Sequence, residues 1–180
     1  MSIVAVTFDP GLEYVGCARG RIQTNQHRVL EHTSTIHTPK SWPDDARMDE
    51  IEHRVCSYLD QHKPAAICVE DYAWYGEDKS GNLNMYRVGR VAHYIEGIAR
   101  RYRWDHGGWV VVLRKVDINA ALGLRGTTSK LRVRTAVERY FGKNRTHGVL
   151  ANEHEVDAAS LLWACAPRLT ARSLKTAKQA

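Results

Sequence analysis

The chain has 180 residues, of which 43% are hydrophobic and 26% charged, and it carries a net charge of +6 with an isoelectric point near 9.3. These values describe one folded domain with its own core and exclude a low-complexity or intrinsically disordered chain. Its first residues lack a cationic segment followed by a long apolar stretch, and no apolar run reaches about eighteen residues. We therefore expect neither export nor a membrane span, and a cytoplasmic location, bacterial or, for a phage-encoded protein, that of the host cell.

Three strands are predicted in the first part of the chain. Apolar and polar residues alternate over 2–9, 14–22 and 27–37, and the turn-forming pairs Pro10-Gly11 and Asn25-Gln26 separate these runs. Short connections join neighbouring strands in opposite directions, so the pattern predicts an antiparallel meander.

Helices and strands alternate in the rest of the chain. Apolar spacing predicts a helix over 44–62, a strand over 65–70, a helix over 83–103, a strand over 109–113, short helices over 116–122 and 129–141, and a last helix from 152 to just before Pro167. This order predicts an α/β fold: a mixed five-stranded sheet of three antiparallel strands followed by parallel strands, with helices on both faces. We expect one domain over 1–166 and a basic, flexible tail over 167–180.

Two of the predicted strands end in a carboxylate. Asp9 follows the first apolar run, and Glu70 ends the run "AAICVE". Ligands of α/β proteins gather at the carboxyl ends of strands, so we expect Asp9 and Glu70 to lie close together. Each also has an ordinary interpretation, because Asp-Pro-Gly forms turns and a glutamate at a strand end can simply face water.

The last predicted helix carries further ionisable groups. Helical spacing places Glu153, His154 and Asp157 on one face, whereas Glu155 points nearly opposite Asp157. Taken singly, Asp157 could stabilise a helix N-terminus and His154 could be a surface histidine. Three converging carboxylates repel one another and need a cation, and oxygen ligands favour Mg²⁺ or Mn²⁺. Two such ions can hydrolyse a phosphodiester, so the pattern indicates a nuclease.

The positive charge is clustered along the chain. Arg100, Arg101 and Arg103 form one group, and Lys130, Arg132 and Arg134 form another. Such groups favour a polyanion such as nucleic acid, although a charged run is often only a solvated face. The four cysteines are scattered without CxxC spacing, which favours free, buried thiols over disulfides or a zinc site.

Three segments resemble motifs of the RuvC family of Holliday junction resolvases, in family order. These are "FDPGLEYVG", "ICVEDYAWY" and "HEVDAASLLWA". The resemblance implies a ribonuclease H-like fold and a catalytic, metal-binding site of Asp9, Glu70 and Asp157, with His154 at the fourth position. His154 departs from the all-acidic pattern, and imidazole is a poor ligand for Mg²⁺. It could instead relay a proton or contact the scissile phosphate, with Glu153 as the alternate ligand.

DNA-binding residues follow from the same resemblance. The segment "GLRGTTSK" resembles the family's Gly-Ser-Lys loop before a helix, which makes Lys130 a phosphate contact that Thr128 or Ser129 could support by capping the helix. Lys115 is a further candidate, but it lies only near this loop in sequence and could be a solvated lysine. Arg132 of the second basic group is another. The aromatic candidates are Tyr72, Trp74 and Tyr75, in the loop that follows Glu70. The family inserts one aromatic side chain of that loop at the junction centre; packing on the adjacent helix is the alternative.

The resemblance also implies assembly and activity. The helix over 83–103 has an apolar stripe and a flank with Gly89, His93 and Gly97, and the family forms homodimers through this helix. We therefore expect a homodimer that resolves Holliday junctions and other branched DNA and leaves 5′-phosphate ends. Each site would use two Mg²⁺ ions, which Mn²⁺ could replace. A branch-migration helicase could be a partner. The alternatives are a related nuclease of structured RNA, a junction-binding protein that does not cut, and an actin-like ATPase or sugar kinase.

Overall fold

The computed structural model describes residues 2–23, 25, 27–72, 83–125, 128–142 and 150–177. Five strands form one sheet: β1 (Ser2–Asp9), β2 (Tyr14–Gln23), β3 (Arg28–His37), β4 (Ala66–Asp71) and β5 (Trp109–Arg114). Their order across the sheet is β3-β2-β1-β4-β5. β1 pairs antiparallel with β2, and β2 pairs antiparallel with β3, whereas β1, β4 and β5 run parallel. The predicted mixed sheet is therefore confirmed.

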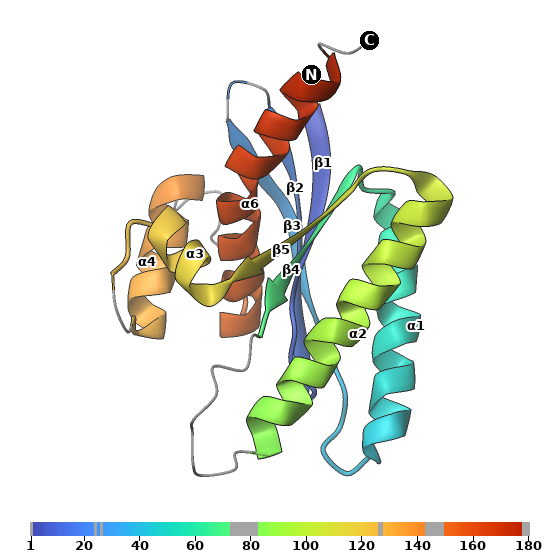
Figure 1. Ribbon diagram of the computed structural model, residues 1–180. Helices are drawn as coiled ribbons and strands as arrows, with labels where there is room; N and C mark the ends of the chain where they lie inside the picture. Colours follow the sequence, from blue (N-terminus) through green and yellow to red (C-terminus); the bar gives the residue numbers. More distant parts are fainter. Residues whose placement is uncertain are drawn as a thin grey trace.

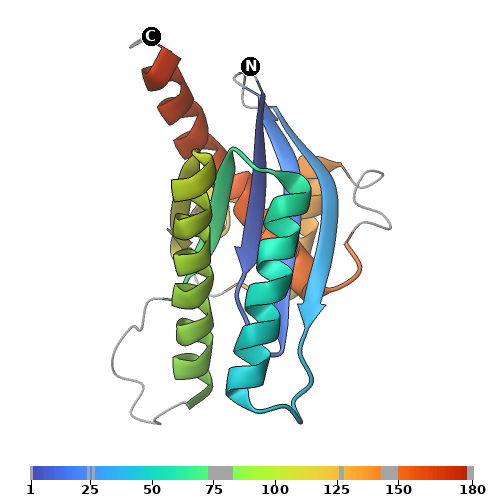
Figure 2. The same ribbon diagram turned by 90° about the vertical axis from the view of Figure 1, so that its right-hand side faces the viewer.

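Helices cover both faces of this sheet. They are α1 (Asp44–His62), α2 (Leu83–His106), α3 (Lys115–Ala121), α4 (Lys130–Phe141) and α6 (Glu153–Ala177). Figure 1 shows α1 and α2 on one side of the sheet and α3, α4 and α6 on the other, and Figure 2 shows α1 and α2 side by side over the first face.

Successive side chains along the strands point to opposite faces of the sheet and so build two separate hydrophobic cores. Phe8, Val15 and Ile67 pack against the apolar stripes of α1 and α2, while Ala5, Ala18 and Cys68 pack against α6 and its neighbours. Successive strand residues point to opposite faces, and a sheet covered on both sides is apolar on both. All four cysteines are free thiols, as predicted, and all but the half-buried Cys56 are buried. No helix of the described ranges is long and apolar enough to cross a membrane.

The last helix is longer than the sequence predicts. We expected it to end before Pro167, but α6 continues through that residue to Ala177 (Figure 1). Proline removes one helical hydrogen bond, yet burial of the following turn compensates: Leu169 is fully buried and Thr170 nearly so. Arg168 also donates to the carbonyl of Val112 at 3.3 Å. The predicted helix end was wrong, and the division into a domain over 1–166 and a flexible tail over 167–180 stays a prediction.

The strand register brings the two predicted carboxylates to one end of the sheet. Phe8 pairs with Val69 across the parallel strands β1 and β4, so Asp9 and Glu70 are the next residues on each strand. In the same direction Glu70 pairs with Leu113 of β5. The start of α3 therefore lies at this end as well.

Candidate active site

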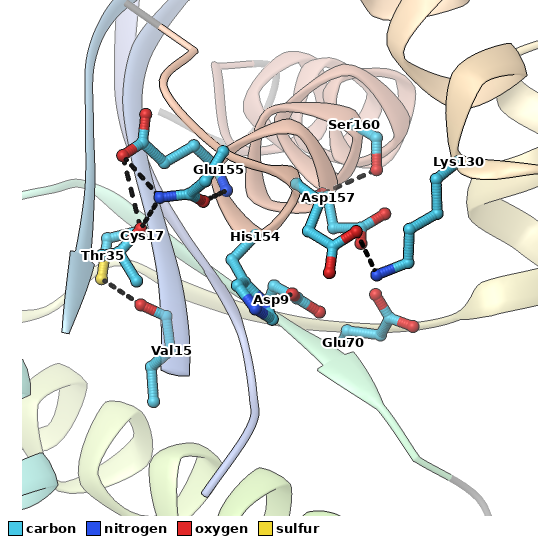
Figure 3. Close-up of polar contacts among 12 residues, drawn as sticks. Asp9, Val15, Cys17, Thr35, Glu70, Lys130, His154, Glu155, Asp157 and Ser160 are labelled. Carbon is cyan, nitrogen blue, oxygen red and sulfur yellow. Dashed lines mark hydrogen bonds and ion pairs between the residues drawn. The ribbon is translucent and has the colours of Figure 1, made fainter. Parts of the chain in front are cut away.

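Asp9 and Glu70 lie close together in a buried polar centre. Their residues are 5% and 1% exposed, although both are acidic. Figure 3 shows His154 and Asp157 of α6 extending toward them from the neighbouring helix. The structure therefore brings together four residues from β1, β4 and α6 that the sequence places up to 148 positions apart, from Asp9 to Asp157.

Glu155 anchors the start of α6 to the sheet. Its carboxylate accepts hydrogen bonds from Thr33 Oγ1 at 2.8 Å, Thr35 Oγ1 at 3.3 Å and the Ala151 amide at 2.9 Å. The Asn152 side chain accepts from the Glu155 amide at 3.0 Å and donates back to its carboxylate at 3.3 Å. This is a capping box tied to β3, and it determines where the neighbouring His154 and Asp157 project.

A second bond holds the following turn of α6 against β1. Thr7 is fully buried, and its hydroxyl donates to the carbonyl of Ala158 at 2.6 Å. Ser160 in turn donates to the carbonyl of Asp157 at 2.6 Å. The backbone that carries Asp157 is therefore fixed on the strand that carries Asp9. Asp9 lies two residues after Thr7 and so is on the same face of the sheet.

Gly16 permits the close approach of α6 to the sheet. It pairs with Asp9 across β1 and β2, and a Cβ built at this position would overlap the carbonyl oxygen of His154. We expect Gly16→Ala to force the helix start away from the sheet and to destabilise the protein by about 1–3 kcal/mol. Thermal unfolding monitored by circular dichroism measures this, and an unchanged midpoint would contradict the packing described here.

The His154 ring is held between Tyr14 and Asp9. Its ring stacks on Tyr14 with centroids 5.1 Å apart, and Tyr14 stacks in turn on His37 at 4.8 Å. His154 Nδ1 lies 3.6 Å from Asp9 Oδ2, which is an ion-pair distance and too long for a hydrogen bond. The carboxylate of Asp9 raises the pKa of His154, and burial opposes this effect.

Lys115 joins the other two carboxylates. Its Nζ lies 2.9 Å from Asp157 Oδ1 and 3.5 Å from Glu70 Oε2. Burial acts against the charged ammonium, but the carboxylates of Glu70 and Asp157 outweigh it and raise the pKa of Lys115. The sequence offered Lys115 only as a candidate contact to DNA near the motif of Lys130, with a solvated lysine as the alternative; the structure places its ammonium among the acidic side chains.

Burial and mutual repulsion make the carboxylates easier to protonate. Burial raises the pKa of Asp9, and the neighbouring His154 offsets part of this rise. Burial likewise raises the pKa of Glu70 to about 8, against the opposing charge of Lys115 and with the help of Asp9 and Asp157. A site with this electrostatic character favours the binding of additional positive charge.

The donor set fits a hard divalent cation. Three carboxylates from β1, β4 and α6 supply the oxygen ligands that Mg²⁺ and Mn²⁺ prefer, and burial leaves their charges poorly compensated by solvent. In the described part of the chain, no three His, Cys, Asp or Glu side chains are close enough to hold an ion as they stand. Glu70 and Asp157 instead turn toward Lys115, so metal binding at this site stays a prediction.

A groove beside Asp157 contains one of the basic groups. It has a volume of about 390 Å³ and lies between α4 and α6, lined by Lys130, Leu131, Val133, Arg134, Glu153, Val156 and Asp157. Lys130 Nζ pairs with Glu153 at 2.6 Å on its rim. Arg132 is exposed on the same helix. Ser129 occupies the cap position of α4, but its side chain makes no capping hydrogen bond, in contrast to one of the expected possibilities.

The aromatic candidates are only partly described. Tyr72 follows β4 and is half-buried, and burial, reinforced by Asp9 and Glu70, raises its pKa. It therefore lies next to the acidic centre. Trp74 and Tyr75 fall outside the described residues.

The architecture is shared with solved structures of known proteins. RuvC of T. thermophilus in complex with a Holliday junction substrate aligns with a TM-score of 0.70 and 21% sequence identity, over 95% of this chain and 96% of that one. The chain has the fold of the RuvC resolvases. A second structure of Thermus thermophilus RuvC aligns at 0.69 with the same identity and coverage.

A more distant resolvase shares the RuvC fold. The yeast mitochondrial Holliday junction resolvase Ydc2 aligns with a TM-score of 0.61 and 11% identity, over 97% of this chain and 85% of that one. No protein-family model and no curated protein matches the sequence. The expected ribonuclease H-like fold is confirmed at the level of structure, where sequence identity is low.

Several residues that shape the site within this RuvC fold escaped the sequence interpretation. Glu155 appeared only as a residue pointing away from Asp157, although the spacing Asn152-x-x-Glu155 is that of a capping box. Thr7 and Tyr14 matter through contacts with α6, more than 130 positions away in sequence, and so does Gly16, which the motif FDPGLEYVG includes but whose contact with α6 it does not reveal. No local pattern signals such contacts.

Proposed function

We propose that the protein is a RuvC-type endonuclease that resolves Holliday junctions and other branched DNA by metal-dependent hydrolysis. The observation that carries this proposal is the convergence of Asp9, Glu70 and Asp157 at the carboxyl ends of β1 and β4, in the fold of the RuvC resolvases. T. thermophilus RuvC with the same fold was solved in complex with a Holliday junction. The net charge of +6 suits a polyanionic substrate.

The acidic residues hold the metal in this proposal. Asp9, Glu70 and Asp157 provide the oxygen ligands, and His154 faces Asp9 as a fourth ligand, a proton relay or a phosphate contact. Two Mg²⁺ ions held there, or Mn²⁺ in their place, would activate a water and stabilise the leaving 3′ oxygen; breakage of the P–O3′ bond leaves a 3′-hydroxyl and a 5′-phosphate end. Glu155 and Thr7 keep α6 on the sheet, which orients His154 and Asp157 toward the reacting phosphate.

The basic groove positions the DNA. Lys130 and Arg132 lie at the start of α4, next to the groove that Asp157 lines, and suit contacts with the phosphate backbone. Tyr72 lies beside the acidic centre and can stack on a base near the scissile bond. Trp74 and Tyr75 stay candidates for the same role. The protein acts in the cytoplasm, of a bacterium or of a phage-infected host, and a branch-migration helicase is a possible partner.

The direct test is a cleavage assay on a labelled four-way DNA junction. With Mg²⁺ or Mn²⁺ we expect symmetrically paired nicks with 5′-phosphate ends, and with a chelator we expect junction binding without cleavage. A linear duplex of the same sequence and a folded RNA are the controls. Cleavage of the RNA alone would identify a structured-RNA nuclease, and binding without cleavage in every metal would identify a junction-binding protein.

Paired nicks require two sites related by a twofold axis, so we propose a homodimer. The flank of α2 with Gly89, His93 and Gly97 is the proposed contact, and His93 is exposed there. Sedimentation equilibrium should give about twice the chain mass of 20.4 kDa. A monomer at concentrations that yield paired nicks would contradict this arrangement.

A further inference from the structure

Lys115 reaches the acidic centre because of its place after β5. Glu70 pairs with Leu113 in the parallel register, and Lys115 begins α3 two residues later. Its ammonium lies 2.9 Å from Asp157 Oδ1 and 3.5 Å from Glu70 Oε2. It therefore contacts carboxylate oxygens from both β4 and α6 at once.

This contact differs from an ordinary surface ion pair. The Glu70 side chain is 1% exposed and that of Asp157 17%, so solvent screens their charges poorly. Lys115 itself is 43% exposed, close to the 52% of the preceding residue Arg114, so the difference lies in the partners: Arg114 pairs with Asp117, whose side chain is 32% exposed. Among the ion pairs of the described residues, Lys115 is the cation that contacts Glu70 and Asp157.

The charges show what Lys115 contributes. Asp9, Glu70 and Asp157 carry three negative charges when ionised, and Lys115 offsets one of them. Its ammonium donates to the same oxygens that would coordinate a divalent ion. An ammonium and a metal ion compete for these oxygens, because like charges held this close together repel each other.

We propose that Lys115 is a built-in counter-cation that competes with the divalent metal for Glu70 and Asp157, so that loading the metal requires its displacement. This inference rests on the proposed metal-dependent function. Without metal, Lys115 holds the carboxylates together and stabilises the fold; with metal, its ammonium leaves these oxygens. The protein therefore binds the metal ion less tightly than the same three carboxylates would without Lys115.

The test measures Mn²⁺ binding by isothermal titration calorimetry without DNA. Lys115→Met keeps the apolar stem and removes the charge, and Arg114→Met is the matched control because it makes the same charge change one residue away. We expect Lys115→Met to bind Mn²⁺ at least about tenfold more tightly than the unmodified protein. We expect Arg114→Met to bind it within about twofold of the unmodified protein, because its charge lies outside the cluster.

Thermal unfolding in excess chelator provides a second, metal-free readout. Lys115→Met should unfold at a lower temperature than Arg114→Met, because its carboxylates lose their counter-charge, and Mn²⁺ should raise its midpoint more than that of the unmodified protein. Equal or weaker Mn²⁺ binding by Lys115→Met would overturn the inference while leaving the proposed function intact. If neither protein bound Mn²⁺, the metal-dependent function would fail together with the inference.

Discussion

Asp9→Asn should abolish junction cleavage while leaving junction binding intact. Asp9 is a buried carboxylate at the meeting point of β1, β4 and α6, and the amide is a much weaker metal ligand. A metal ion supplies several kcal/mol of transition-state stabilisation, which at about 1.4 kcal/mol per tenfold corresponds to a loss on the order of 10³-fold in rate. Binding should be retained or strengthened, because one negative charge that repels phosphate disappears.

Single-turnover cleavage and fluorescence anisotropy on the same labelled junction separate these two effects. Asp60→Asn is the matched control, since Asp60 is exposed on α1 and the change in charge is the same. Circular dichroism verifies that both variants fold. Cleavage by Asp9→Asn at the normal rate, or a parallel loss of binding, would count against a metal site at Asp9.

Glu155→Ala should strongly destabilise the helix that completes the site. The buried carboxylate accepts hydrogen bonds from Thr33, Thr35, Asn152 and the Ala151 amide, and alanine can replace none of them. A buried donor that loses its partner costs about 1–3 kcal/mol, so we expect a loss of about 3 kcal/mol in the free energy of unfolding. Activity should fall as well, because the start of α6 carries His154 and Asp157.

Urea denaturation measures this loss, with Glu153→Ala as the control. Glu153 lies two residues earlier on the same helix, and its half-exposed side chain pairs with Lys130 at the surface. Surface ion pairs contribute less than about 1 kcal/mol, so this variant should remain near the original stability. Similar losses for the two variants would show that the network around Glu155 is not what holds α6 in place.

The sheet and the acidic site could be predicted because their signals are local. The alternation of apolar and polar residues identifies β1 and β2 as strands. Asp9 and Glu70 end their strands, so they lie close together once β1 and β4 are parallel neighbours. The faces of α6 also follow from helical spacing, so the placement of His154 and Asp157 near these carboxylates was foreseeable.

Other features depend on packing between distant segments and therefore left no local signal. The continuation of α6 past Pro167 results from burial of Leu169 against the sheet, which outweighs the local preference of proline to end a helix. The ammonium of Lys115 meets Glu70 only because β5 lies beside β4 in register. The stacking of Tyr14 on His154 likewise requires the folded helix.

The site is assembled from segments at both ends of the chain, and this has a consequence during synthesis. Asp157 and the helix that carries it are synthesised 148 residues after Asp9, when all five strands have already been made. A nascent chain that has formed only its first hairpin still lacks Glu70, Asp157 and the helix that packs over β1 and β2. An unfinished copy therefore cannot bring Asp9, Glu70 and Asp157 together.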